Sequence, residues 1–226
     1  MPPILVFDVN ETLLDLAAFD ASFDQYFGDV AVRHEWFDQM LLIAFTTAIT
    51  GPYADFGTIG RAALGVVERR YHRSLSDEER SQILGTIRRL APHPDVEGGL
   101  RRLQQGGLRM VTLTNSTAQV AEAQLAHAGL SHYFERVFSA DSVRSLKPSS
   151  VPYRMVAEKM SVDIGSLLLV AAHAWDIVGA ISAGCRAAFI ERPGRFLDAL
   201  TPRPDYAAAN LELLADQILR QERLDR

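Results

Sequence analysis

Asp8 is the acidic side chain with the clearest chemical context in this sequence. It follows the apolar run Ile4-Leu5-Val6-Phe7, which contains β-branched residues and is too short for a helix, so the run predicts a buried strand. A carboxylate at the C-terminal end of a parallel strand lies where open α/β sheets bind their ligands. Asp8 is therefore a candidate for chemistry, and the alternative is a solvated or capping aspartate at a strand end.

Three further segments carry polar side chains that we expect to lie near Asp8. Thr114-Asn115 and residues 173–176 each follow an apolar run, and Lys147 lies in a loop. Because the carboxyl ends of parallel strands share one edge of a sheet, these groups would lie together. A lysine beside Asp8 would keep its carboxylate ionised by lowering its pKa. The alternative for Lys147 is the surface position that most lysines occupy.

Strands and helices alternate from His93 onward, and this alternation predicts the sheet that would position these groups. After the first strand, the expected strands cover residues 109–113, 137–139, 166–171 and 187–190, and the expected helices cover 95–105, 117–128, 152–160, 175–183 and 211–224. Residues 195–206 are expected to form a proline-containing loop. Strands separated by helices imply a parallel sheet with right-handed crossovers and both faces covered. The predicted fold class is α/β, with a Rossmann-like parallel sheet.

Residues 16–92 contain no convincing strand. Apolar residues recur at helical spacing in four runs, which cover residues 16–27, 32–50, 56–71 and 77–90. Ser76 and Glu79 match a capping box at the start of the last run. This part of the chain is predicted to be a small helical domain inserted just after the first strand.

The composition is that of an ordinary soluble globular protein. The chain has 226 residues, a net charge of -5 and a pI near 5.7, so it has no basic footprint for nucleic acid. The six histidines form no close pair and Cys185 is the single cysteine, which excludes a disulfide framework and suits a reducing compartment. No apolar stretch approaches the ~20 residues that a membrane span needs. We expect a cytoplasmic protein that binds neither nucleic acid nor membrane.

The order of these segments resembles the motifs of the haloacid dehalogenase superfamily. An apolar run followed by Asp8 and then Thr12 matches its first motif, and Thr114, Lys147 and Asp176 match the next three. The superfamily places its first cap domain where this chain has the helical insertion. The resemblance implies an α/β catalytic core made of residues 1–15 and 93–226, with residues 16–92 as a helical cap domain.

Two details differ from the phosphatases of that superfamily. A phosphatase has a second aspartate two residues after the nucleophile, where this chain has Asn10, and a Gly-Asp pair after the fourth strand, where it has Ala171 to Asp176 as AAHAWD. The missing acidic groups protonate a leaving oxygen and hold magnesium, which phosphoryl transfer needs. A halide leaves as a stable anion and needs only a dry pocket with hydrogen-bond donors.

The sequence is instead similar to the L-2-haloacid dehalogenase family. Lys147-Pro148 followed by Tyr153, Leu113-Thr114-Asn115-Ser116, and Ala172-His173-Ala174-Trp175-Asp176 resemble that family's Lys-Pro-x-x-x-x-Tyr, Leu-Ser-Asn-Gly and Ser-Asn-Ala-Trp-Asp runs. Family members usually carry Tyr at position 10, Ser at position 171 and Asn at position 173, where this chain has Asn10, Ala171 and His173.

The resemblance implies a role for each matched residue. Asp8 would attack the carbon that bears the halogen and form an ester, which water then hydrolyses at the Asp8 carbonyl carbon. Lys147 would hold Asp8 ionised, and Asp176 would orient Lys147 and help to activate water. The residues expected to bind the substrate or the halide are Thr12, Asn10, Arg33, Thr114, Asn115, Tyr153 and Trp175.

His173 and Arg33 each have an alternative. His173 is either a strand-end histidine bonded to a backbone group or the group that positions water and takes its proton near neutral pH. Arg33 matches the cap arginine of the family, although Arg61 lies later in the same region.

Hydrolysis of (S)-2-haloacids or haloacetates, without metal or cofactor, is the leading hypothesis. The resemblance also implies a homodimer. The alternatives are a magnesium-dependent phosphatase of the same superfamily and a non-catalytic relative, because one fold hosts all three.

Overall fold

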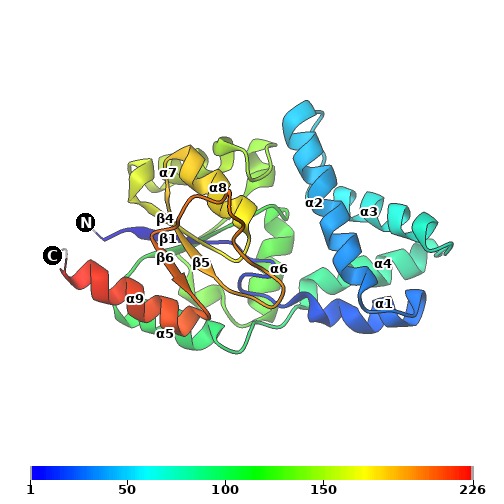
Figure 1. Cartoon of the computed structure of the whole chain (residues 1–226), viewed down its shortest axis with the longest axis horizontal. Coiled ribbons are helices and arrows are strands. Elements are labelled where there is room, and N and C mark those ends of the chain that lie inside the picture. The colour runs from blue at the N-terminus through cyan, green and yellow to red at the C-terminus, as the bar shows by residue number, and fades with distance from the viewer. Residues whose placement is uncertain (1, 225–226) are drawn as a thin grey trace.

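A parallel sheet of six strands forms the centre of the computed structural model, which describes residues 2–224 (Figure 1). Its strand order is β3-β2-β1-β4-β5-β6, and β1 pairs with both β2 and β4. The strands are β1 (Ile4–Phe7), β2 (Met110–Thr114), β3 (Arg136–Ser139), β4 (Leu167–Ala171), β5 (Arg186–Ile190) and β6 (Tyr206–Ala208). The predicted α/β fold class with a parallel sheet is confirmed.

Helices cover both faces of the sheet, and the alternation of side chains along β1 decides which helices lie on each face. The covering helices are α5 (Val96–Gln105), α6 (Ala118–His127), α7 (Ser150–Met160), α8 (Ala174–Ala183) and α9 (Leu211–Leu224). Leu5 and Phe7 belong to the cluster that includes apolar residues of α5 and α9. Ile4 and Val6 point to the opposite face and belong to the cluster of α7 and α8. Figure 1 shows these two helix pairs on opposite sides of the strands.

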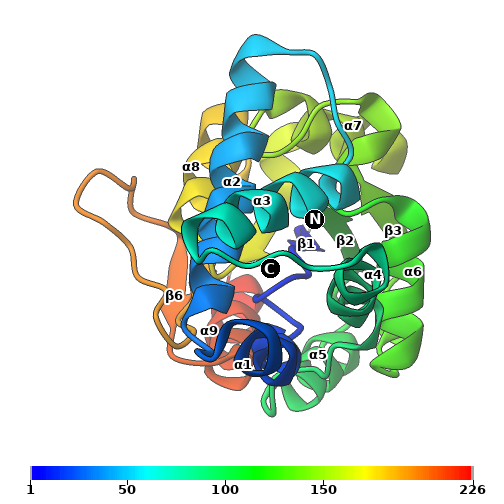
Figure 2. The ribbon, with the colours of Figure 1, turned by 90° about the vertical axis from the view of Figure 1, so that its right-hand side faces the viewer.

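Residues 16–89, here called the helical segment, lie beside the carboxyl ends of the strands (Figures 1 and 2). The segment contains α1 (Asp20–Phe27), α2 (Val32–Thr50), α3 (Phe56–Arg70) and α4 (Asp77–Gly85), with short 3-10 helices at Leu16–Phe19 and Thr86–Arg89. The capping box of Ser76 and Glu79 is present at the start of α4. Phe19, Phe23 and Trp36 form an aromatic core inside the segment, with ring centroids 5.0 to 6.5 Å apart.

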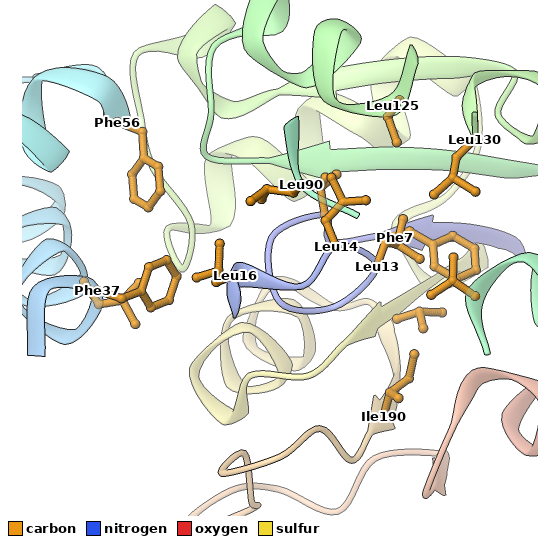
Figure 3. Packing of buried hydrophobic residues seen from close by; sticks show 14 of the residues in the cluster. Phe7, Leu13, Leu14, Leu16, Phe37, Phe56, Leu90, Leu125, Leu130 and Ile190 are labelled. Atoms are coloured by element: carbon orange, nitrogen blue, oxygen red, sulfur yellow. The ribbon is translucent and has the colours of Figure 1, made fainter. Parts of the chain in front are cut away.

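The two connections between the helical segment and the sheet run side by side. The backbone N–H of Asp15 donates to the carbonyl of Ala91, and that of His93 donates to the carbonyl of Leu13. Figure 3 shows Leu13 and Leu14 close to Phe7, with Leu90 beside Leu14. Apolar packing therefore continues from the sheet to the base of the helical segment.

Strand β6 corrects one expectation from the sequence. Residues 195–206 were expected to form a loop, but Tyr206 begins a three-residue strand that pairs with β5. Three residues are too few to show an alternating pattern. The strand depends on tertiary contacts instead, because the Asp205 carboxylate accepts a hydrogen bond from the backbone of Ala187 at the edge of β5. Further short 3-10 helices cover Ser131–Tyr133, Ala140–Val143 and Ile164–Ser166.

Candidate active site

Asp8 lies at the carboxyl end of β1 with its side chain 7% exposed. One carboxylate oxygen, Oδ1, accepts a hydrogen bond from Lys147 Nζ at 2.9 Å, and the other, Oδ2, accepts one from the Thr12 hydroxyl at 2.6 Å. The Thr12 hydroxyl in turn accepts from the backbone N–H of Ala172, just after β4. The turn that follows β1 is thereby fixed to the neighbouring strand, and the orientation of the carboxylate is set.

Lys147 uses all three ammonium protons on fixed partners. Its Nζ donates to Asp8 Oδ1, to the carbonyl of Leu113 at 2.9 Å and to Asp176 Oδ2 at 2.6 Å. The side chain is fully buried. Burial by itself would lower the pKa of Lys147, but the charges of Asp176 and Asp8 raise it above its usual value. The lysine therefore stays charged and carries no proton that is free for transfer.

The same charges keep Asp8 ionised. Burial by itself would raise the pKa of Asp8, but Lys147, His173 and Thr12 together hold that pKa well below its usual range. Asp176 is also buried, and burial raises its pKa although Lys147 opposes this. The Tyr153 hydroxyl donates to Asp176 Oδ1, so both carboxylate oxygens of Asp176 are bonded. Together, Asp8, Lys147, Asp176 and Tyr153 form a closed cluster, here called the lysine cluster.

A second charged group approaches Asp8 from the other side. His173 Nε2 lies 2.8 Å from Glu11 Oε2, and His173 Nδ1 lies 3.4 Å from Asp8 Oδ2. Arg195 donates to Glu11 and places its guanidinium 5.7 Å from the ring of Phe37. Glu11 is buried in the turn after β1, where its backbone has a φ of 61°. His173, Glu11 and Arg195 are here called the histidine cluster.

The histidine cluster holds a protonated imidazole. Burial by itself would lower the pKa of His173, but Asp8 and Glu11 raise it to about 9. Burial would likewise raise the pKa of Glu11, whereas His173 and Arg195 hold it below its usual value. The 3.4 Å separation between His173 Nδ1 and Asp8 does not form a regular hydrogen bond, and within residues 2–224 this nitrogen has no hydrogen-bond partner. Its attraction to Asp8 is therefore mainly electrostatic, and one ring nitrogen faces the site unbonded.

Amide side chains fix the loops around the site. The Asn115 side chain donates to the Lys147 carbonyl and accepts from the Lys147 backbone N–H, so it holds the loop that carries the lysine. Asn10 donates to the Ser116 hydroxyl at 3.1 Å and accepts from Gln124 at 2.8 Å. The Thr114 hydroxyl accepts from the backbone N–H of Ser116. These groups keep the ends of β1 and β2 at a fixed separation.

A small pocket, here called the catalytic pocket, opens onto Asp8. Its floor is polar, with Asn10, Thr114, Asn115, Lys147 and His173, and its remaining wall is apolar, with Phe37, Leu41, Phe56 and Trp175. The indole N–H of Trp175 is buried and has no acceptor within the described residues. The arrangement therefore presents an ionised carboxylate and an unused N–H donor to a small, largely apolar space.

Comparisons with known proteins identify the family of the chain. A sequence profile for haloacid dehalogenase-like hydrolases matches residues 3–184. The chain belongs to the haloacid dehalogenase-like hydrolases. It is 26% identical to (S)-2-haloacid dehalogenase 2 of Pseudomonas sp. strain CBS-3 over 212 residues, which cover 93% of each chain. It is 28% identical to haloacetate dehalogenase H-2 of Moraxella sp. strain B over 218 residues, or 95% of this chain and 96% of the relative.

A solved structure extends the comparison. The chain superposes with a TM-score of 0.89 and 25% identity on the L-2-haloacid dehalogenase of Xanthobacter autotrophicus with chloropropionic acid covalently bound, covering 96% of this chain and 98% of that one. The resemblance to L-2-haloacid dehalogenases found in the sequence is thereby confirmed.

Most of the predicted site residues of this haloacid dehalogenase-like hydrolase come together, and Arg33 is the exception. Its guanidinium is buried in the helical segment, bonded to Asp20 at 2.5 Å and beside His34. It does not line the catalytic pocket. Two arginines from the loop after β5 do reach the strand ends: Arg195 donates to Glu11, and Arg192 donates to the carbonyl of Thr12.

Sequence reasoning did not identify Glu11, Arg195, Phe37 and Phe56 as site residues. Glu11 carried a usable signal, because it lies in the turn after the candidate nucleophile beside Thr12. Arg195 carried none, since 184 positions separate it from Glu11. Phe37 and Phe56 had the spacing of ordinary helix core residues.

Two further properties of the described residues concern metal ions and membranes. Residues 2–224 contain no group of three or more His, Cys, Asp or Glu side chains placed to hold a metal ion. In the same range, no helix is both long and apolar enough to cross a membrane.

Proposed function

We propose that this haloacid dehalogenase-like hydrolase converts short (S)-2-haloacids or haloacetates to 2-hydroxy acids through an ester on Asp8. The observation that carries the proposal is the buried Asp8 carboxylate, which Lys147 keeps ionised at the floor of a largely apolar pocket. A desolvated carboxylate in that position is an activated nucleophile. The names of the relatives from Pseudomonas and Moraxella support this choice of substrate.

The first step is a displacement at the carbon that bears the halogen. A carboxylate oxygen of Asp8 attacks this carbon from the side opposite the halogen, and the carbon–halogen electron pair leaves with the halide. The free N–H of Trp175 is a donor for the departing anion, and the apolar wall excludes water that would compete with Asp8. The carbon inverts once, so an (S)-2-haloacid gives an (R)-2-hydroxy acid.

The second step hydrolyses the ester and uses His173. Ester formation removes the negative charge of Asp8, and this loss lowers the pKa of His173, which Asp8 had helped to raise. The imidazole can then release its Nδ1 proton to solvent and accept a proton from the water that attacks the Asp8 carbonyl carbon; His173 takes the first proton back from solvent once Asp8 is again ionised. Collapse of the tetrahedral intermediate expels the hydroxy acid oxygen, which takes a proton from His173. Glu11 holds the opposite ring nitrogen throughout.

Substrate binding involves the remaining polar residues. Thr12 orients Asp8, and Thr114 lies at the end of β2 in the pocket lining, where its hydroxyl would receive the substrate carboxylate. Asn115 and Asn10 act mainly through the loops that they hold, since their amides bond to other residues. Arg33 has no role in this scheme.

Metal independence belongs to the same proposal. Asn10 occupies the position from which a phosphatase would protonate the leaving oxygen, and its amide has no acidic proton to give. Halide departure needs neither that proton nor a cation that spreads phosphoryl charge. The buried charges of the lysine cluster also argue against a non-catalytic protein. Burying such charges has a high cost in free energy, which a protein without catalytic function would have no reason to bear.

We further propose that residues 16–92 act as a cap over a core formed by residues 1–15 and 93–226. The helical segment supplies Phe37, Leu41 and Phe56 to the pocket wall. We propose a homodimer on the ground of the resemblance. We propose a cytoplasmic location because a single cysteine suits a reducing compartment. Exposed Leu42 and Ile49 on α2 are candidate contact residues for that dimer.

The test is halide release from chloroacetate, bromoacetate, fluoroacetate and (S)-2-chloropropionate, with and without EDTA. We expect release that EDTA does not change, and no release from Asp8→Asn, in which the amide is not a nucleophile. Circular dichroism checks that Asp8→Asn is folded. Phosphate release from phosphomonoesters only with added magnesium would instead support the phosphatase hypothesis.

A further inference from the structure

The catalytic pocket is too small to hold a substrate in this structure. Its volume is about 10 Å³, which is the space of a single water and too little for a haloacid. Lys147 and Asp8 are fixed by their ion pairs, so the apolar wall is the part that can yield. Phe37, Leu41 and Phe56, which all come from the helical segment, make up most of that wall. Substrate entry therefore requires at least one of these side chains to move.

A second pocket, here called the side pocket, lies behind the same wall. Its volume is about 260 Å³, close to the lower end of the range for small-molecule sites. Phe37 and Phe56 line both pockets and separate them. The other apolar lining residues are Trp36, Met40, Leu84, Ile87 and Val120. An apolar space of this size beside a small reaction site is suited to an alkyl chain.

The two separating rings differ in how firmly they are held. Phe37 stacks on His173 with ring centroids 6.1 Å apart, and the Arg195 guanidinium makes a cation–π contact with its ring. Both of these neighbours belong to the histidine cluster. Phe56 is the first residue of α3, and it makes no ring or cation contact within the described residues. Figure 3 shows the two rings on separate elements of the helical segment. Phe56 is therefore the ring that can turn aside at lower cost.

The backbone after β2 connects the two pockets. Thr114 and Asn115 line the catalytic pocket, and Ser116 and Thr117 line the side pocket. A substrate whose carboxylate is held at this segment would have a direct path for its chain past Phe56. Arg88 also lines the side pocket, is exposed, and forms no ion pair within residues 2–224. Asp55 lines the same pocket, so the pocket carries one charge of each sign, and its remaining lining is mainly apolar.

We propose that the side pocket binds the alkyl chain of 2-haloalkanoic acids longer than 2-halopropionate, and that Phe56 gates the passage from the catalytic pocket. This inference rests on the proposed dehalogenase function, which it deepens by naming the substrate class. Each buried methylene adds roughly fourfold to binding. The preferred substrates are then medium-chain acids, and haloacetate fills only the catalytic pocket.

The test fills the side pocket from a position remote from the reacting groups. Val120 lies on α6 and lines the side pocket but not the catalytic pocket, and Val120→Phe places a ring inside the side pocket. We expect kcat/KM for (S)-2-bromohexanoate to fall at least about tenfold while that for (S)-2-bromopropionate stays within about twofold, since three methylenes lose their site. Val151→Phe, at an exposed position on α7, is the matched control and should change neither value.

A binding measurement separates this inference from the proposed function. Hexanoate and acetate carry no halogen, so calorimetry reports their binding without turnover. We expect the unmodified protein to bind hexanoate more tightly than acetate and Val120→Phe to lose that preference. If no haloacid releases halide but this pattern holds, the dehalogenase function fails and the chain-binding pocket stands. Equal binding of both acids, or a preference that Val120→Phe leaves unchanged, would overturn the inference.

Two further variants test the pocket from another helix and test the gate itself. Leu84→Phe fills the same pocket from α4, should Val120→Phe prove unfolded by circular dichroism. Phe56→Ala removes the gate, and we expect the ratio of kcat/KM for bromohexanoate to that for bromopropionate to rise about tenfold. A ratio that stays constant in Phe56→Ala would contradict the gating role.

Discussion

The lysine cluster and the histidine cluster flank the same carboxylate, yet they are built differently. In the lysine cluster every ammonium proton has a fixed acceptor, and Lys147 and Asp176 are completely buried. In the histidine cluster one imidazole nitrogen has no partner among the residues that the structure describes, and the outer member, Arg195, is 19% exposed. The first cluster is closed to solvent, whereas the second reaches it.

This difference separates two requirements of the proposed reaction. The displacement needs a carboxylate whose charge and direction do not vary, which a lysine with three fixed bonds provides. The hydrolysis needs a group that changes protonation within one turnover, which an imidazole between two carboxylates provides once one of them becomes an ester. A single cluster could not meet both requirements, because fixed protons cannot be transferred.

Removal of Lys147 should have the largest effect on both activity and stability. Lys147→Met leaves Asp8 and Asp176 buried without their counter-charge, and breaking a buried pair costs about 3–5 kcal/mol of unfolding free energy. Turnover should fall by about 10⁴-fold, the scale seen when a charged orienting residue is removed from another covalent catalytic set. Urea unfolding and halide release measure the two losses. Unchanged stability would show that the lysine cluster is not the closed structure described above.

Removal of His173 should affect mainly the second half of the reaction. Loss of a base that acts on water slows a reaction by about 10²–10⁴-fold, whereas alkylation of Asp8 transfers no proton. His173→Ala should therefore release one equivalent of halide in a burst and then turn over slowly. Mass spectrometry after mixing with chloroacetate should show the protein heavier by a carboxymethyl group.

His173→Asn sharpens the same comparison. An asparagine amide can orient a water but cannot take its proton, so this variant should also accumulate ester. If His173→Asn hydrolyses the ester at the normal rate, orientation suffices and the imidazole is not the base. If His173→Ala loses activity without any ester, the histidine serves binding or folding.

Glu11 should have a smaller effect, exerted through His173. Glu11→Gln keeps a hydrogen-bond acceptor for the imidazole but removes a charge that raises its pKa. Loss of an orienting partner of this kind typically costs about 10–100-fold. We expect kcat to fall in that range with a shifted pH profile. A fall in kcat with the pH profile unchanged would indicate a purely structural role for Glu11.

The parts of this site that the sequence predicted are those built from local patterns. Asp8, Thr114 and Asp176 follow apolar strands, and parallel strands bring their carboxyl ends to one edge, so their proximity follows from the fold class. Lys147 was placed by its Lys-Pro context. The α/β class was recognisable because each long strand is a continuous buried run.

The parts that sequence reasoning missed depend on contacts between distant residues. A glutamate in a turn is usually solvated, and Glu11 is buried only because Arg195 and His173 meet it there. Arg33 matched the cap arginine of the family, but Asp20 on the preceding helix binds its guanidinium instead. The apolar side chains of Phe37 and Phe56 fit a helix core equally well, so periodicity could not assign them to a pocket wall.

The pH dependence of the two kinetic constants provides the finest test of the comparison. In the free enzyme, kcat/KM reports the displacement, and His173 is protonated below its pKa of about 9. Loss of this proton removes one of the positive charges that balance Asp8 and Glu11 beside the anionic substrate, and only Lys147 and Arg195 then remain as their counter-charges. We therefore expect kcat/KM to fall, by a few-fold, as the pH rises through 9, whereas the value for His173→Gln should not change in that range.

The same histidine should give the opposite trend in kcat. In the ester, the pKa of His173 is lower because Asp8 is neutral, and the base must be unprotonated, so kcat should fall as the solution becomes acidic. The unfolding free energy depends on the pKa shift of His173 in the free enzyme. Because the pKa of His173 in the folded protein exceeds the ordinary 6.5, the stabilising contribution of His173 is complete below pH 6.5 and is lost as the pH rises towards 9. Lys147, whose pKa is raised above its usual value, should keep its own contribution across this whole range. A kcat/KM profile that stays level through pH 9, or one that His173→Gln does not alter, would show that the two clusters do not divide the reaction in this way.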